Sequence, residues 1–111
     1  MSRAEFQLKT HRGASPSAEV VVTGEVDASN VVEFTRSVRK LSGARPIILQ
    51  LSSVRYLDSA GFSALDRLLA EDEIVIVLAP DSFMYRVAEL MCMPIHHSAK
   101  AARKSLQNGA G

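Results

Sequence analysis

The sequence predicts an α/β fold in which helices pack on a mostly parallel, mixed β-sheet that begins with an antiparallel pair of strands. Three observations predict it. Short β-branched or apolar runs alternate with longer segments whose apolar residues recur at helical spacing. Two runs, residues 47–51 and 74–78, are almost continuously apolar, which is typical of strands covered on both faces. The alternation itself indicates parallel strands joined by right-handed helical crossovers.

The N-terminal part of the chain predicts the antiparallel pair. Residues 6–9 alternate between apolar and polar side chains, as in an edge strand, and residues 20–23 are β-branched and end at Gly24. Residues 13–17, which contain glycine, serine and proline, predict the turn between them. A hairpin is therefore expected here.

A first helix is predicted over residues 29–41. Its apolar residues recur at steps of three and four, and they are Val31, Phe34, Val38 and Leu41. Ser29 or Asn30 can cap its start, and Gly43 is a C-terminal stop signal. The apolar run at residues 47–51 follows, and we expect it to be a central parallel strand.

Two further helices follow the two apolar runs. Residues 52–57 are predicted to connect the first run to a helix with one apolar face. That face is Phe62, Leu65, Leu68 and Leu69. Asp81 or Ser82 caps the next helix, and Pro94 ends it. Its apolar residues at helical spacing are Phe83, Val87, Leu90 and Met91. Cys92 stands in an apolar run, and we expect it to pack in the core.

The C-terminal segment predicts a short strand at residues 95–97 and a helix at residues 98–106. The residues expected to face inward are Ala99, Ala102 and Leu106. The residues expected on a solvated face are Lys100, Arg103 and Lys104.

With 111 residues, the chain is expected to form a single domain over residues 1–111, with a core at about 19–106 and flexible ends. Its formal net charge of +1 disfavours nucleic acid as a direct partner. No apolar run is long enough to span a bilayer, so no membrane contact is expected and the cytoplasm is the predicted location. A single cysteine excludes an internal disulfide.

The most informative segment is Asp58-Ser59-Ala60-Gly61, which precedes the second predicted helix. A helix start offers unpaired backbone N–H groups and the positive end of the helix dipole, so it accommodates added negative charge. Ser59 is therefore a candidate phosphorylation switch. Asp58 or Ser59 can also be a plain N-cap, since both residue types favour that position.

Two motifs carry a resemblance to a known family. The run Val-Thr-Gly-Glu-Val-Asp at residues 22–27 and the run Tyr-Leu-Asp-Ser-Ala-Gly-Phe at residues 56–62 resemble the STAS domain of bacterial anti-sigma factor antagonists. The resemblance implies a protein that binds an anti-sigma factor and so frees a sigma factor. It also implies that the anti-sigma factor, itself a serine kinase, phosphorylates Ser59 to end the binding, and that a serine phosphatase resets the switch.

The resemblance implies roles for the neighbours of Ser59 as well. Asp27 matches an aspartate that helps form the partner surface, Asp58 the acidic residue before the phosphoacceptor, and Gly61 a glycine in the first turn of the helix. Together with Ser63, these residues are the expected partner-binding site. Asp27 can instead be a turn residue held by an Asx-type bond, and Gly61 can serve the close approach of helix and strand.

The sequence contains no recognisable catalytic frame, nucleotide-binding fingerprint or metal-ligand set. We therefore expect no enzyme activity, no catalytic residues, no cofactor and no metal. The alternative function is a non-switching STAS-type subunit of a transport or signalling assembly. The connection at residues 69–73 is shorter than the usual one in the family, which can alter the choice of partner.

Overall fold

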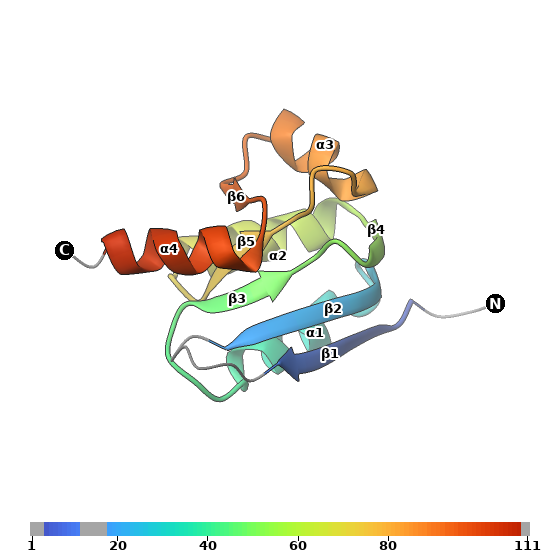
Figure 1. Cartoon of the computed structure of the whole chain (residues 1–111). Coiled ribbons are helices and arrows are strands. Elements are labelled where there is room, and N and C mark those ends of the chain that lie inside the picture. The colour runs from blue at the N-terminus through green and yellow to red at the C-terminus, as the bar shows by residue number, and fades with distance from the viewer. Residues whose placement is uncertain (1–3, 12–17, 110–111) are drawn as a thin grey trace.

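The computed structural model describes residues 4–11 and 18–109, which form an α/β fold with six strands in one mixed sheet and four helices (Figure 1). This confirms the predicted fold class. The strands are β1 (Phe6–His11), β2 (Glu19–Val26), β3 (Ile47–Gln50), β4 (Val54–Leu57), β5 (Ile74–Val77) and β6 (Ile95–His96). The helices are α1 (Val31–Arg39), α2 (Ser59–Ala70), α3 (Phe83–Leu90) and α4 (Ala99–Gly109).

The sheet has the strand order β1-β2-β3-β5-β6, and β4 also pairs with β2. Strands β1 and β2 are antiparallel from Phe6↔Gly24 to His11↔Glu19, which confirms the predicted strand pair. The predicted turn at residues 13–17 lies outside the described residues. The other pairs are parallel. Helices α1, α2 and α3 form the crossovers that lead to β3, β5 and β6, whereas β4 follows β3 after only three residues.

Strand β4 lies in the segment predicted as a connection. It pairs with the end of β2 through Gly24↔Val54, Glu25↔Tyr56 and Val26↔Leu57, with an irregularity in the register after Gly24. Its two middle residues are exposed, so it lacks the continuous apolar run that predicts β3 and β5. Strands β3 and β4 therefore lie one after the other along the same side of β2.

The helices cover both faces of the sheet (Figure 1). Helices α1 and α2 lie on one face, where they enclose the main core. Helix α4 lies on the other face, where Ala102 joins Ile48 and Val77 in a smaller cluster. Ile47, Ile48 and Leu49 have no exposed area, so β3 is a central strand buried on both faces, as its apolar run predicts.

Helix α3 does not turn its predicted apolar face to the core. Phe83 and Leu90 are 77% and 79% exposed, and Met91, just after the helix, is 46% exposed. Met84 and Ala88 are buried instead. A helix of eight residues makes little more than two turns, so one large and one small contact are enough to orient it. Periodicity alone does not distinguish between two neighbouring apolar stripes.

The prediction that Cys92 packs in the core is wrong, because its side chain is exposed. The Cys92 N–H donates to the Glu89 carbonyl oxygen at 3.0 Å, and Cys92 has a left-handed φ of 56°. The Met93 N–H donates to the Ala88 carbonyl oxygen, also at 3.0 Å. This is a Schellman turn, in which the left-handed residue points away from the core and the next residue, Met93, is buried.

The short connection from α2 to β5 uses the same kind of turn. Asp72 has a left-handed φ of 57°, and its N–H donates to the Leu69 carbonyl oxygen at 3.1 Å. The Glu73 N–H donates to the Leu68 carbonyl oxygen at 3.0 Å. Two hydrogen bonds back to the helix thus let the chain enter β5 within a few residues.

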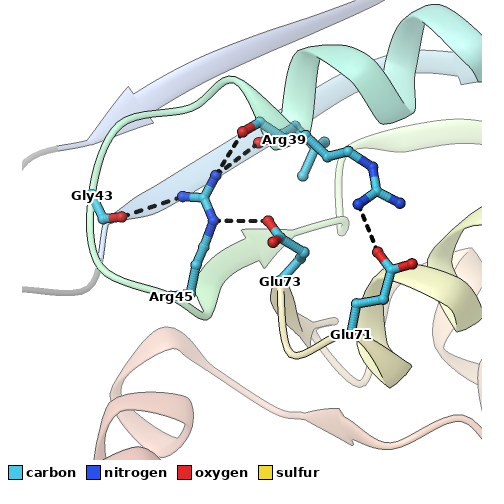
Figure 2. A network of polar contacts seen from close by, with 6 residues as sticks. Arg39, Gly43, Arg45, Glu71 and Glu73 are labelled. Atoms are coloured by element: carbon cyan, nitrogen blue, oxygen red, sulfur yellow. Dashed lines mark hydrogen bonds and ion pairs between the residues drawn. The ribbon is translucent and has the colours of Figure 1, made fainter.

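Two arginines bind the acidic side chains of this connection (Figure 2). Arg39 of α1 lies 2.7 Å from Glu71, and Arg45 Nε donates to Glu73 Oε2 at 2.8 Å. The Arg45 guanidinium also donates to the carbonyl oxygens of Arg39, at 2.9 Å, and Gly43, at 3.3 Å. Arg45 therefore joins the loop before β3 to the turn before β5.

The predicted solvated face of α4 is correct for Lys100 and Lys104 and wrong for Arg103. The Arg103 side chain is half-buried, and its Nη2 atom lies 3.4 Å from Glu19 Oε1 on β2. A long aliphatic stem can cover apolar surface while its charged end reaches a partner, which a helical pattern of polar residues does not reveal.

Candidate functional site

The pairing of β2 with β4 brings two aspartates together. Val26 and Leu57 are paired at the ends of these parallel strands, so the next residues, Asp27 and Asp58, leave the sheet at the same edge. The Asp58 N–H donates to the Val26 carbonyl oxygen at 3.3 Å. The Ala28 N–H donates to Asp58 Oδ2 at 3.2 Å. The loop after β2 is thus tied to the start of α2.

Asp58 is the N-cap of α2. Its backbone is extended, with φ −92° and ψ −174°, and its Oδ1 atom accepts a hydrogen bond from the Gly61 N–H at 3.0 Å. Of the two residues that could serve as a cap, Asp58 is therefore the one that does. Ser59 is the first residue of the helix, and its side chain is exposed.

Asp27 is held by its own loop. Its Oδ1 atom accepts hydrogen bonds from the Ser29 N–H at 2.8 Å and from the Ser29 hydroxyl at 2.5 Å, an Asx-type turn. The hydroxyl of Ser29, and next its N–H, hold the pKa of Asp27 below its usual value. The carboxylate is therefore charged at neutral pH and oriented within the loop.

Asn30 is a site residue whose role the sequence does not reveal. It was expected as one possible helix cap, and it stands at the N-cap of α1 without a capping bond from its side chain. Its Oδ1 atom instead accepts from the Asp27 N–H at 2.9 Å, while its Nδ2 donates to the carbonyl oxygens of Ala4 and Glu25 at 3.0 Å each. This buried amide joins the start of the chain to the loop of Asp27.

Gly61 stands where helix α2 lies close to the end of β4. A Cβ atom at this position would lie 2.5 Å from Leu57 Cδ1 and 3.2 Å from the Val26 carbonyl oxygen. Both distances are shorter than ordinary contacts. The close-approach explanation for this glycine is therefore supported, and the glycine lets Asp58 cap the helix directly above the sheet.

Ser63 lies one helical turn after Ser59 on the exposed side of α2, and it lines a groove of about 630 Å³ between α1 and α2. The groove has apolar walls from both helices, including Val32, which is 67% exposed. Its basic lining residues are Arg36, Arg39, Lys40 and Arg67. Among the described residues, only Arg39 of these four forms an ion pair. A basic groove thus begins beside the helix start.

The site offers one exposed hydroxyl at a helix start, next to two ordered carboxylates. Within residues 4–11 and 18–109, no cluster of three or more His, Cys, Asp and Glu side chains is arranged to hold a metal ion. In the same part of the chain, no helix is long and apolar enough to cross a membrane.

The fold and the paired loops define a STAS domain. The profile of the STAS domain matches residues 5–79, more than half of the chain, and the chain belongs to this family. The match covers β1 through β5 and includes both aspartates and Ser59.

One curated protein resembles part of the chain in sequence. A stretch of 47 residues is 40% identical to Osmosensory protein A of Mycobacterium tuberculosis (strain ATCC 25618 / H37Rv), covering 41% of this chain and 30% of that protein. The chain thus matches less than a third of that relative's length.

Two solved structures share the fold. An anti-sigma factor antagonist from Mycobacterium paratuberculosis has a TM-score of 0.69 at 16% identity, covering 93% of this chain and 95% of that one. The anti-sigma factor antagonist SpoIIAA in its unphosphorylated form has a TM-score of 0.59 at 14% identity, covering 95% and 99%. At these identities, the likeness concerns the fold.

Proposed function

We propose that this protein is an anti-sigma factor antagonist that binds a serine-kinase anti-sigma factor, frees a sigma factor and is switched off by phosphorylation of Ser59. The observation that carries the proposal is the exposed hydroxyl of Ser59 at the first position of α2. Asp58 already caps the helix, so Ser59 is available for modification without the loss of a capping bond.

Phosphate at Ser59 would add roughly −1.5 to −2 charges at neutral pH, beside the charged loop of Asp27 and Asp58. The helix start favours the added charge through its dipole, so the domain stays folded. A partner surface that accepts a neutral hydroxyl would then face a dianion. Like-charge juxtaposition and desolvation cost several kcal/mol at an interface, which is enough to release the partner.

In this proposal the chemistry belongs to the partners. The anti-sigma factor transfers the phosphoryl group from ATP to the Ser59 hydroxyl, and a serine phosphatase removes it. The antagonist itself catalyses nothing, requires no cofactor, contacts neither nucleic acid nor membrane, and acts in the cytoplasm as a single domain. Asp27, Asp58 and Ser63 form the surface around Ser59 that the anti-sigma factor binds, and the buried Gly61 supports this surface by holding α2 close to β4.

Incubation with serine-kinase anti-sigma factors and ATP, followed by intact-mass and peptide mass spectrometry, tests the proposal. The wild-type chain and the Ser105→Ala variant are expected to gain one phosphoryl group, and Ser59→Ala is expected to gain none. Ser105 is the matched control because it is an exposed helical serine outside the proposed partner surface.

The alternative, a non-switching subunit of a transport or signalling assembly, makes a different prediction. In that case no kinase modifies Ser59, and the wild-type, Ser59→Ala and Ser59→Glu chains bind the same partner with equal affinity. This result would refute the proposed switch.

A further inference from the structure

The solvent side of α3 carries most of the large apolar side chains that are exposed in the described chain. Of five such residues, Phe83 and Leu90 lie on α3 and Met91 directly follows it. With the half-buried Val87, they form one stripe at helical spacing. Helix α3 is therefore apolar toward the solvent as well as toward the core, which is typical of a helix with a second packing partner.

Two charged residues accompany this stripe. Arg86 and Glu89 are exposed, and neither forms an ion pair with any residue in the part of the chain that the structure describes. One cation and one anion leave the exposed face without net charge. A strongly acidic or strongly basic partner would leave one of the two charges opposed by a like charge.

We propose that this face of α3 docks on the same face of a second copy of the chain, with the two helices antiparallel about a two-fold axis. Such an axis across the middle of the helix sets Phe83 of each copy against Leu90 of the other. The same operation brings Arg86 of each copy toward Glu89 of the other. The face is thus complementary to itself both in its apolar contacts and in its charges.

The dimer is weak and depends on concentration. Its core is one helix of eight residues from each copy, which is less surface than stable dimers bury. We expect a dissociation constant in the micromolar range or above, because small interfaces belong to weak, transient complexes.

Sedimentation equilibrium of the full chain over a range of about 5–500 µM tests the inference. The apparent mass is expected to rise from the monomer value of 12.0 kDa toward twice that value. The double variant Phe83→Ser/Leu90→Ser is expected to weaken the dimer at least ~10-fold, because it removes both Phe83–Leu90 contacts and a few apolar anchors carry most of the binding energy. Val32→Ser, which removes an exposed apolar side chain from α1, is the matched control and leaves the dimer unchanged.

Charge exchange tests the two-fold geometry. Arg86→Glu and Glu89→Arg each place like charges opposite one another and are expected to weaken the dimer several-fold. The double variant Arg86→Glu/Glu89→Arg restores the opposite pairing and is expected to recover wild-type dimerisation.

A wild-type chain that stays at the monomer mass at the highest concentration overturns the inference. A dimer that survives Phe83→Ser/Leu90→Ser overturns it too, as does a double charge variant that fails to recover. Circular dichroism of each variant separates loss of association from loss of folding. If the double serine variant is unfolded, the single variant Leu90→Ser replaces it in the same comparison.

Discussion

The two ends of helix α2 are built in opposite ways. At its start, Asp58 holds the N–H groups of Gly61 and Ala28, and Ser59 stays exposed on the first turn. At its end, a Schellman turn and two arginine–glutamate pairs hold the chain in place (Figure 2). The helix is therefore anchored at its C-terminal end and at its cap, whereas its first residue is exposed and provides no capping bond.

The largest expected effect is on partner binding at the N-terminal end. Ser59→Glu adds a negative charge at the proposed interface, and we expect the affinity for the proposed anti-sigma factor partner to fall at least ~100-fold, about 3 kcal/mol. The free energy of unfolding is expected to change by less than about 0.5 kcal/mol, because the helix dipole favours an anion there. Calorimetric titration and urea unfolding measure the two quantities.

Ser105→Glu is the control for this change, since it adds the same charge to an exposed position of α4. It is expected to leave binding unaltered. A Ser59→Glu chain that unfolds, or that binds as well as the wild type, would contradict the separation between folding and switching.

The next largest effect is expected on the free energy of unfolding, from a substitution at the N-terminal end of α2. Asp58→Ala removes the acceptor of the Gly61 and Ala28 N–H groups, and we expect it to lower the free energy of unfolding by about 1–2 kcal/mol. Asp58→Asn keeps one carbonyl oxygen as a cap and is expected to cost less than half as much. Urea unfolding compares the three chains. Equal stability of all three would show that the two bonds do not hold the helix start.

Substitutions at the C-terminal end of α2 are expected to lower the free energy of unfolding by a smaller amount. Arg45→Ala removes a half-buried guanidinium that donates to Glu73 and to two or more carbonyl groups, so we expect a loss of about 1 kcal/mol in the free energy of unfolding. Arg39→Ala breaks a more exposed pair with Glu71 and is expected to cost at most about 0.5 kcal/mol. Neither variant should alter phosphorylation of Ser59. A change in the phosphorylation rate would show that the two ends are coupled.

The smallest effect concerns the charge of Asp27. Because its pKa is lowered in the fold, its contribution to stability is complete above the usual unfolded-state value of about 3.9 and is lost as the pH falls through the lower folded-state value. Ser29→Ala removes the hydroxyl donor but keeps the N–H donor, so the pKa of Asp27 is expected to rise part of the way to its usual value. NMR titration of the carboxyl carbon measures it, and an unchanged pKa would exclude the hydroxyl as the main cause.

The sequence predicts those parts of the fold that a simple burial pattern determines. The runs at residues 47–51 and 74–78 become β3 and β5 because central parallel strands are covered on both faces. The apolar face of α2 is also as predicted, with Phe62, Leu65 and Leu68 buried. Strand β4 has no such pattern, since its pairing with β2 rather than its burial makes it a strand.

The candidate site is predictable in its residues but not in its contacts. The pattern predicts a helix start at Asp58 and Ser59, yet the bond from the Ala28 N–H to Asp58 joins residues thirty positions apart. The amide of Asn30 likewise bonds to its own loop and to Ala4, which lies twenty-six positions away in the sequence. The exposure of Cys92 depends on a backbone turn with no glycine to mark it, and the orientation of α3 depends on the burial of Met84 and Ala88.

Because Val26 pairs with Leu57, the register of the sheet fixes the spacing between the loops that carry Asp27 and Asp58. A slip of one residue between these strands would shift one aspartate along the edge by about 3.3 Å and turn its neighbours to the other face. Main-chain groups form the ladder, but the buried side chains of Val26 and Leu57 fix its register, because a slip would turn them toward the solvent. The spacing of the two acidic loops therefore depends on a few buried side chains of the two strands, and exposed side chains around the loops can be exchanged without changing it.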